Sequence, residues 1–420
     1  MSNVQNYIVR ITRSDRAAMR ILIAALVLTL IFRLMWFIHA GHHSFIWDEK
    51  TYDGIGYRMS TNGWSMTNNE GKLTAFVGPT YPVFVALVYT VFGHNPQAVY
   101  ILQILLAVLT TYLIYRIGVL LTASRIVSAV AALIVAAYIP LVQWASLVHT
   151  EILFTLLMAA TIYFVLVAIR RKSTACFVVA GVMAGVTTLC RGSALPLPFF
   201  MVVLILMMSV KTRKLIAGLS LFLVVFLFTL SPWVVRNYIV FNAFVPGATE
   251  AGYVMWSGTY GEYGIAPKTL PKHILKYLYA HPNEIEQNTF YQKEAIKNIK
   301  TNPVHWICLS FRKFTQFWLN VGYGKTPSKS SIAIMFTHLI LIILSIFSLK
   351  SIKDRLGMWI LIAVLVNFTL VHMITIGLVR YAVPFVPYIT ILGVRGFFRL
   401  VPSLERYLSL DSSVVASNIG

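Results

Sequence analysis

Three acidic residues in this 420-residue sequence, an adjacent pair and a single glutamate, have the type and location needed for proton transfer beside a membrane. Residues 47–52 place the adjacent carboxylates Asp48 and Glu49 shortly after an apolar run, and Glu151 opens a second apolar run. A carboxylate in such a position can accept a proton from a hydroxyl group. The alternatives are a solvated charged loop for Asp48 and Glu49, and a helix-capping acid for Glu151.

Three arginines lie at the ends of apolar runs on the same side as these acids. Arg191 and Arg236 each end a run, where a cation at a helix C-terminus that reaches the headgroups is the alternative explanation. Arg380, followed by Tyr381, begins a run, where a cation opposes the helix dipole. Arg380 therefore predicts an anionic partner, either a carboxylate or a phosphate. Acids beside such cations suit group transfer from a phosphate-linked donor.

The composition determines which elements must position these residues. The chain is 58% hydrophobic and 12% charged, whereas soluble proteins are about 25% charged. A soluble enzyme, a disordered chain and a secreted disulfide scaffold are excluded. We expect an all-α polytopic membrane protein with about ten spanning helices, because each needs about 20 mostly apolar residues. The predicted spans are residues 20–40, 97–121, 126–144, 151–169, 174–190, 195–210, 214–240, 331–349, 356–377 and 381–400.

The net charge of +21 is explained mainly by membrane topology. With ten spans, all the short loops rich in Lys and Arg fall on one side, which predicts that this side and both termini are cytoplasmic. No nucleic-acid motif is present. The outer side then carries two long segments, 41–96 and 241–330, and the second contains amphipathic stretches suited to the headgroup plane. Residues 82–92 are apolar but too short to span.

Other candidate sites are weaker. His39, His42 and His43 are expected to be interfacial histidines rather than metal ligands, since adjacent histidines cannot easily share an ion on a regular helix. The cofactor stays open: if a divalent metal ion is bound, Asp48 and Glu151 are its expected ligands. Arg33 is expected in the bundle interior, paired with a carbonyl or an acid.

The chain resembles the GT-C superfamily of integral-membrane glycosyltransferases, over roughly residues 20–400. It is most similar to the branch that includes protein O-mannosyltransferases and lipid A aminoarabinose transferases. The motifs that carry the resemblance are short, and they occur in the expected order and on one side of the membrane. They are Asp48-Glu49 with Tyr52, Gly78 to Pro82, Val91 to Gly93, Thr150-Glu151, Gly185 to Leu189 with Arg191, Pro232-Trp233 with Arg236 to Tyr238, and Arg380-Tyr381 with Pro384 and Pro387.

The resemblance implies an outer-face active site and inverting transfer from a polyprenyl-phosphate sugar. The catalytic base maps to Asp48, with Glu49 as its neighbour and Glu151 as the second acid. The lysine of a lysine–proline element found in the aminoarabinose branch is replaced within residues 77–81, so donor and acceptor stay open. The residues expected to bind the donor phosphate are Arg236, Arg380, Arg191 and Tyr381, and those expected to bind substrate are Tyr52, Tyr81, Trp233 and His149.

The sequence thus predicts a GT-C-like membrane domain over residues 1–400, whose outer loops build the active site, and a cytoplasmic tail over 401–420. The leading hypothesis is a bacterial inner-membrane glycosyltransferase with a periplasmic active site. It uses an undecaprenyl-phosphate-linked monosaccharide and a hydroxyl of a surface glycan, lipopolysaccharide or protein. The alternatives are a transporter or flippase for a lipid-linked glycan, and a polymerase or ligase of the O-antigen type.

Overall fold

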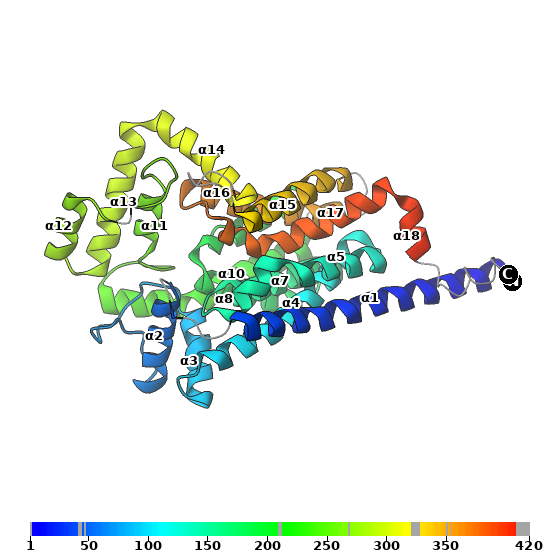
Figure 1. The fold of residues 1–420 in the computed structure, drawn as a ribbon, viewed down its shortest axis with the longest axis horizontal. Helices are drawn as coiled ribbons and strands as arrows, with labels where there is room; N and C mark the ends of the chain where they lie inside the picture. Colours follow the sequence, from blue (N-terminus) through cyan, green and yellow to red (C-terminus); the bar gives the residue numbers. More distant parts are fainter. Residues whose placement is uncertain are drawn as a thin grey trace.

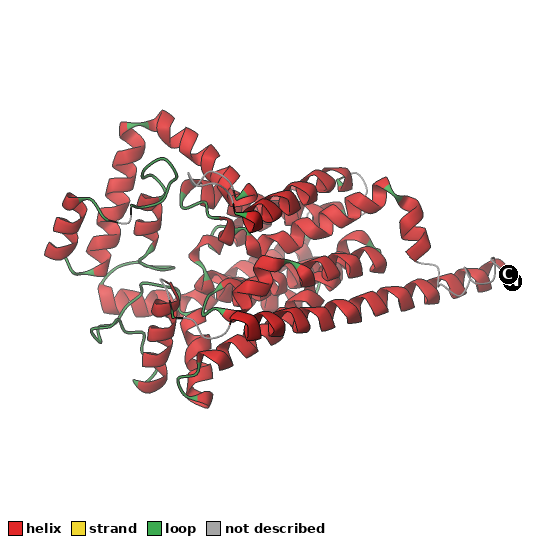
Figure 2. Ribbon diagram, in the orientation of Figure 1, coloured by secondary structure: helices red, strands yellow, loops and turns green. Residues whose placement is uncertain are grey.

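The fold is all-α, as predicted. The computed structural model describes residues 2–40, 44–45, 48–208, 212–267, 269–320, 328–349, 352 and 354–408, with side chains from Asp15 onward except at 406 and 408. Over these ranges every regular element is helical (Figure 2), and the only strand-like pairing is one bridge between Thr67 and Leu73.

The helices are numbered in their order along the chain. The α-helices are α1 (Ser2–Ala40), α2 (Asp48–Thr61), α3 (Thr80–Phe92), α4 (Pro96–Thr122), α5 (Arg125–Ala137), α6 (Ile139–Gln143), α7 (Glu151–Arg171), α8 (Thr174–Cys190), α9 (Leu197–Met208), α10 (Arg213–Phe241), α11 (Ala251–Ser257), α12 (Lys272–Ala280), α13 (Glu284–Thr301), α14 (Pro303–Leu319), α15 (Lys329–Ser348), α16 (Arg355–Ile374), α17 (Val386–Leu400) and α18 (Pro402–Leu408). The 3-10 helices are η1 (Trp144–Ser146), η2 (Gly192–Ala194), η3 (Val379–Tyr381) and η4 (Val383–Phe385).

A helix lies within each of the ten predicted spans, but these helices are not equally long. Seven helices in the described part of the chain are long and apolar enough to cross a membrane: α1 from Asp15, α4, α7, α10, α15, α16, and the segment Val379–Leu400 that contains α17. The predicted span 126–144 is a pair of helices, Arg125–Ala137 and Ile139–Ser146, bent by 60°. Pro140 starts the second helix, since proline suits the first turn of a helix and cannot continue one. Helix α8 and the segment Gly192–Met208 are shorter apolar helices.

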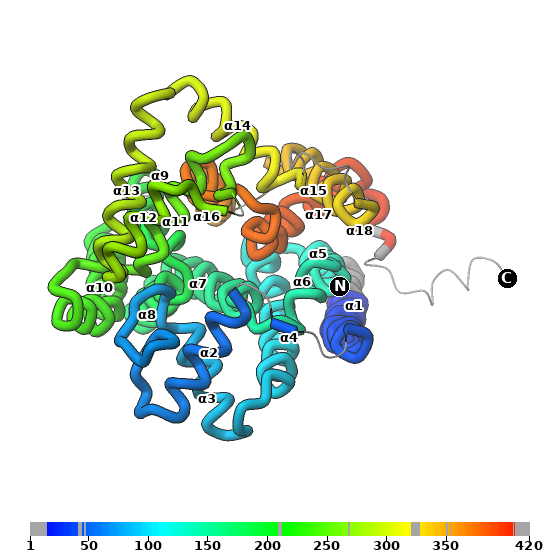
Figure 3. The backbone as a smooth tube through the Cα atoms, turned by 60° about the vertical axis from the view of Figure 1, so that its left-hand side comes forward, coloured from blue at the N-terminus to red at the C-terminus, as the bar shows by residue number. Residues whose placement is uncertain are grey.

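The spans pack around α7 and α17. In α7, 78% of the most apolar stretch is buried inside the protein, and in Val379–Leu400 83%, whereas the figure for α15 is 11%. Helix α7 contacts α4 and α8, while α17 contacts α15 and α5. Figures 1 and 3 show α7 inside the bundle, with α1 running along one side. The residues that begin α7 and precede α17 are therefore held by packing on several sides.

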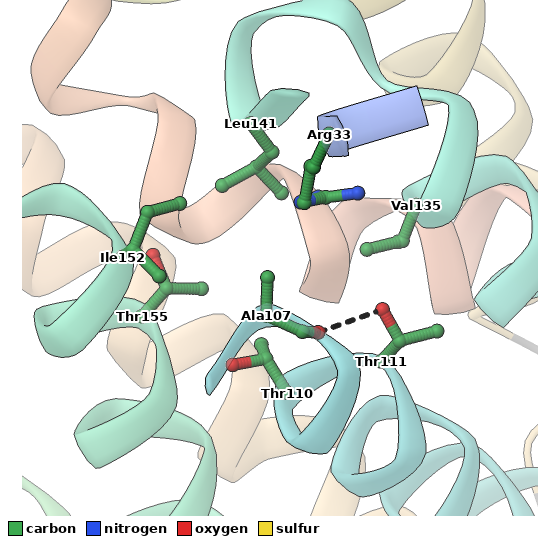
Figure 4. Close-up of a pocket in the computed structure, with 8 residues that line it drawn as sticks. All are labelled: Arg33, Ala107, Thr110, Thr111, Val135, Leu141, Ile152 and Thr155. Carbon is green, nitrogen blue, oxygen red and sulfur yellow. Dashed lines mark hydrogen bonds between the residues drawn. The ribbon is translucent and has the colours of Figure 1, made fainter. Parts of the chain in front are cut away.

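Arg33 lies inside the bundle, as expected from the sequence. Its side chain is 1% exposed, and it donates hydrogen bonds of 3.2 Å to the carbonyl oxygens of Thr29 and Ala136. Figure 4 shows it among the residues that line a small pocket. The volume of this pocket is about 10 Å³, which suits one water molecule. The residues lining this pocket are Arg33, Ala107, Thr110, Thr111, Val135, Leu141, Ile152 and Thr155. Pairing with carbonyls reduces the cost of burying the guanidinium.

The helices outside the membrane spans gather at one end of the bundle, which we call the loop end. Helices α2 and α11 to α13 lie there, whereas α18 lies at the opposite end (Figure 1). The two long loop segments are joined directly. Glu284 accepts hydrogen bonds from the Thr74 hydroxyl, at 2.7 Å, and from the amide of Ala75, at 2.8 Å. The amide of Thr249 donates to the Ala75 carbonyl at 2.9 Å, so the segments form one continuous structure.

A glycine allows the close packing of α15 and α17. A Cβ added at Gly396 would overlap the carbonyl oxygen of Leu344 in α15, and small residues at such contacts are typical of membrane helix pairs. We expect Gly396→Ala to destabilise the protein by about 1–3 kcal/mol through overpacking. Thermal unfolding in detergent measures this, with Gly192→Ala as the matched control because a Cβ there meets no atom within 4 Å. Equal midpoints for the two variants would contradict this packing.

Candidate active site

An ion pair joins the start of α2 to the segment before α17. Nη2 of Arg380 lies 2.5 Å from Oδ2 of Asp48 and donates a second hydrogen bond, of 3.0 Å, to the hydroxyl of Tyr381. The anionic partner predicted for Arg380 is therefore a carboxylate of the first long loop. The Asp48 side chain is 42% exposed and that of Arg380 25%. Both groups are thus reachable by a substrate as well as by each other.

A second ion pair lies deeper. Nη2 of Arg191, at the end of α8, lies 2.8 Å from Oε1 of Glu151, whose side chain is fully buried at the start of α7. The other oxygen, Oε2, lies 3.8 Å from Nδ1 of His149 and accepts no hydrogen bond from a described residue. Burial lowers the pKa of His149, so its imidazole is neutral at pH 7. Glu151 thus compensates Arg191 rather than capping an isolated helix.

Tyr381 connects the two pairs. The guanidinium carbon of Arg191 lies 5.2 Å from its ring centroid and that of Arg380 lies 4.7 Å away, distances at which the ring attracts a cation. His372 stacks on Tyr381 with ring centroids 4.9 Å apart, and Phe317 stacks on His372 at 5.1 Å. We call Asp48, Glu151, Arg191 and Arg380 the charge cluster. An aromatic stack that starts in α14 supports it.

Glu49 and Tyr52, the other site residues predicted from the first loop, contact segments around the charge cluster. Glu49 is 1% exposed and accepts a hydrogen bond of 3.2 Å from the amide of Val148, which ties α2 to the loop before Glu151. Tyr52 packs edge-on against Tyr81, with ring centroids 5.0 Å apart. These contacts favour a positioning role for Glu49 over the catalytic role predicted from the sequence.

Tyr81 and His149 complete this support. The Tyr81 hydroxyl donates a hydrogen bond of 2.8 Å to the side chain of Gln103, which in turn donates to the carbonyl of Leu147 at 2.8 Å. The ring centroid of His149 lies 6.3 Å from that of Tyr52. Tyr52, Tyr81 and His149 thus hold the segment that leads into Glu151.

Arg236 and Trp233 lie apart from the charge cluster. The guanidinium of Arg236 donates to the side chain of Asn237 at 2.9 Å and to the carbonyl of Met66 at 3.5 Å, and it lies 5.1 Å from the ring centroid of Trp233. The indole of Trp233 donates to the Gly247 carbonyl at 2.7 Å. None of their described contacts is with the charge cluster. The structure therefore gives both residues a role in joining α10 to the loops.

Sequence reasoning missed Glu250 and Tyr253, which approach the cluster from α11. Burial, reinforced by the negative charge of Asp48, raises the pKa of Glu250 to about 7. Burial also raises the pKa of the Tyr253 hydroxyl, with Tyr381 and Asp48 as contributing neighbours. No motif marks either residue, because the docking of the second long loop on the first brings the start of α11 within electrostatic reach of Asp48.

A divalent metal ion does not fit the predicted ligands well. Asp48 and Glu151 each face an arginine, and a cationic partner competes with a metal ion for the carboxylate oxygens. In the described ranges, no group of three or more His, Cys, Asp or Glu side chains is arranged to hold a metal ion.

Comparison with known proteins finds one family model and several solved structures that this chain is similar to. Residues 77–235 match the family described as dolichyl-phosphate-mannose-protein mannosyltransferase. The solved structure of the oligosaccharyltransferase AglB from Archaeoglobus fulgidus, in complex with an inhibitory peptide and a dolichol-phosphate, superposes with a TM-score of 0.59 at 13% identity. It covers 94% of this chain, which spans about half (52%) of AglB. No protein of curated function matches the chain by sequence.

A second solved structure is that of ArnT from Cupriavidus metallidurans bound to undecaprenyl phosphate. It matches with a TM-score of 0.44 at 14% identity, over 91% of this chain and 77% of ArnT. The likeness to AglB shows that the two proteins share a fold, which is the fold that the resemblance seen in the sequence implies. This chain is an integral membrane protein.

Glu250 makes the stability of the loop end dependent on pH. Its pKa is about 7 in the folded protein and about 4.5 in the unfolded chain, so folding favours the protonated acid. The contribution of Glu250 to the free energy of unfolding is therefore most favourable below pH 4.5 and is lost as the pH rises toward 7. We expect Glu250→Gln, a neutral isostere, to raise the unfolding midpoint at pH 8 more than at pH 5.

The exposed acid Glu262 provides the matched control, because its substitution by Gln changes the same formal charge without a buried carboxylate. The test is thermal unfolding of the wild type, Glu250→Gln and Glu262→Gln at pH 5 and at pH 8. A Glu250→Gln midpoint that follows the wild-type midpoint in parallel at both pH values would contradict the raised pKa.

Proposed function

We propose that this chain, which has the fold of the GT-C membrane glycosyltransferases, transfers a monosaccharide from a polyprenyl-phosphate donor to an acceptor hydroxyl. The observation that carries the proposal is the partly exposed ion pair between Asp48 and Arg380 at the loop end. An acid and a phosphate-binding cation lie within one hydrogen bond of each other, which is the arrangement that such a transfer requires.

The proposed reaction is a single inverting displacement. The acceptor oxygen attacks C1 of the sugar, the bond between C1 and the phosphate oxygen breaks, and the hydroxyl proton passes to Asp48. The guanidiniums of Arg380 and Arg191 stabilise the negative charge that develops on the departing lipid phosphate. Tyr381, which lies beside both, supplies a hydroxyl that donates to the same phosphate. Glu151 keeps Arg191 in place, because removing one partner of a buried pair is strongly unfavourable.

Donor binding and base activation are linked in this scheme. Without donor, Arg380 neutralises Asp48 at 2.5 Å. A phosphate that binds Arg380 competes with Asp48 for the same guanidinium, which leaves the carboxylate free to take the acceptor proton. Asp48 thus becomes an effective base only when a donor is present, so it does not deprotonate an acceptor hydroxyl before the donor has bound.

The location of the site supports a lipid-linked donor. The charge cluster lies where α7, α8 and the segment before α17 reach the loop end, so a phosphate bound there can keep its polyprenyl chain in the bilayer. AglB, which shares the fold, was solved with a dolichol-phosphate. We place the loop end on the periplasmic face of a bacterial inner membrane, with both termini cytoplasmic, from the distribution of basic loops.

The distribution of charge also favours an enzyme over a flippase. A flippase would need charged groups along the translocation path, through the middle of the bilayer. Within the described spans, Arg33 is a deeply buried cation bonded to backbone carbonyls, whereas ion pairs with exposed atoms lie at helix ends, such as Asp48 with Arg380 and Arg170 with Asp354. A flipping assay in proteoliposomes is expected to show no transport of the lipid-linked sugar.

We expect Asp48→Asn to reduce transfer by about 100- to 10,000-fold, since general bases contribute that much. The assay uses the protein in membranes with undecaprenyl-phosphate-linked, radiolabelled glucose, mannose, galactose or aminoarabinose. Glu70→Gln, an exposed acid in the same loop with a side chain that is 68% exposed, is the matched control. Wild-type turnover by Asp48→Asn would eliminate the proposed role. Absence of transfer by the wild type from every donor would eliminate the function.

A further inference from the structure

Two polar side chains at the start of α11 lie within electrostatic reach of the charge cluster. Glu250, which precedes α11, and Tyr253 are three residues apart, so they lie on one side of the first turn. Both side chains are partly buried, and both lie within electrostatic reach of Asp48. Glu250 also lies within electrostatic reach of Arg191 and Arg380, and Tyr253 within reach of Tyr381, so both belong to the surroundings of the charge cluster.

The position of α11 is fixed tightly by the surrounding chain. The Gly252 amide donates a hydrogen bond of 2.8 Å to the side chain of Asn288 in α13. Nζ of the fully buried Lys313 donates to the carbonyl oxygens of Gly258, at 2.9 Å, and Thr375, at 3.0 Å. A Cβ at Gly258 would overlap the Thr375 carbonyl. The C-terminal end of α11 thus packs on the segment that leads from α16 to Arg380.

Glu250 differs from the other acids of the site in its partners. Asp48 and Glu151 each form an ion pair with an arginine. No described residue donates a hydrogen bond to the carboxylate of Glu250 or forms an ion pair with it, although its backbone amide is bound to the Phe76 carbonyl at 3.2 Å. A partly buried carboxylate without a partner is costly, and such groups mark functional sites more often than structural ones.

Resting on the function proposed above, we propose that Glu250 and Tyr253 form the acceptor-binding wall and that the acceptor is a sugar. The reacting hydroxyl of the acceptor faces Asp48, and Glu250 accepts a hydrogen bond from a neighbouring hydroxyl. A sugar carries several adjacent hydroxyls, so it can satisfy both carboxylates at once, whereas a serine or threonine side chain has only one. Tyr253, whose ring packs against Trp256 and Tyr291, supplies its hydroxyl to the same sugar.

The arrangement assigns different tasks to the three acids. Asp48 takes the proton, Glu151 holds Arg191, and Glu250 orients the acceptor without exchanging atoms with it. The cost of keeping Glu250 unpartnered in the free protein is then offset when acceptor hydroxyls donate to it. Acceptor binding is expected to weaken as the pH falls below about 7, because the protonated acid is a poorer hydrogen-bond acceptor.

Two measurements on the full-length protein in nanodiscs test the proposal. The first is labelling of Glu250 by a water-soluble carbodiimide at pH 6.5, quantified by mass spectrometry, with and without the methyl glycosides of glucose, galactose, mannose and N-acetylglucosamine. A serine-containing peptide is the competing probe. We expect at least one glycoside to reduce labelling of Glu250 several-fold and the peptide to leave it unchanged. Protection by the peptide alone, or by no probe, would overturn the proposal.

The second measurement is steady-state transfer to the protecting glycoside. Loss of a hydrogen bond to a charged group is expected to raise the KM for the glycoside about 10- to 100-fold in Glu250→Gln. The KM for the donor should stay within about twofold, as for the control Glu262→Gln. A purely structural role would lower kcat and affect both substrates. An unchanged KM for the glycoside contradicts the proposal.

The two proposals fail in different ways. Protection of Glu250 by a glycoside in a protein that transfers no sugar would support the acceptor wall and refute the transferase. Transfer that depends on Asp48 but is unaffected by Glu250→Gln, with no protection, would refute the acceptor wall alone.

Discussion

The need to compensate charges at the edge of the membrane domain organises this structure. Glu151 is completely buried, and a lone carboxylate there would cost several kcal/mol. Its pairing with Arg191 fixes the start of α7 against the end of α8. Arg380 adds a second cation at the same place, and its charge is met by Asp48 from a different part of the chain. The two pairs share Tyr381, so neither can move without affecting the other.

This constraint explains why segments outside the membrane have such specific packing. Arg380 lies in the short stretch between α16 and α17, and that stretch is held by Lys313 of α14 and by the stack of Phe317 and His372 on Tyr381. The loop helices thus set the position of a residue that belongs to the membrane domain. Substitutions in α11 or α14 are therefore expected to alter the ion pair between Asp48 and Arg380, although neither helix contains a residue of the charge cluster.

The sequence allowed a large part of this arrangement to be predicted. Apolar runs predicted ten spans, and in the described part of the chain seven helices, or eight if the bent pair is one span, are long and apolar enough to cross a membrane. Asp48, Glu151, Arg191 and Arg380 were predicted to lie on one side of the membrane, and the structure brings the four together in two ion pairs joined by Tyr381, whereas their chemical roles stay predictions. The break at Pro140 was missed, since periodicity alone does not distinguish one long helix from two bent ones. Arg236 and Trp233 were assigned to the site from their sidedness, but sidedness does not specify which cations share a surface.

Glu250 was not predictable for a related reason. Its sequence neighbourhood is that of an ordinary polar loop, and its importance arises from a contact between residues 74–76 and 249–250 that pairs two distant loops. The electrostatic environment of Glu250 exists only once the two loops have docked on each other. The same holds for Lys313, which is buried among backbone carbonyls and has no local sequence signal.

The central claim is that the donor phosphate and Asp48 compete for Arg380. The affinity of the protein for undecaprenyl phosphate in nanodiscs, measured for the wild type, Asp48→Asn and Arg380→Met, tests it directly. Competition predicts that Asp48→Asn binds the lipid phosphate more tightly than the wild type, because Arg380 no longer has an anionic partner, and that Arg380→Met binds it more weakly. Unchanged or weaker binding by Asp48→Asn would contradict the account.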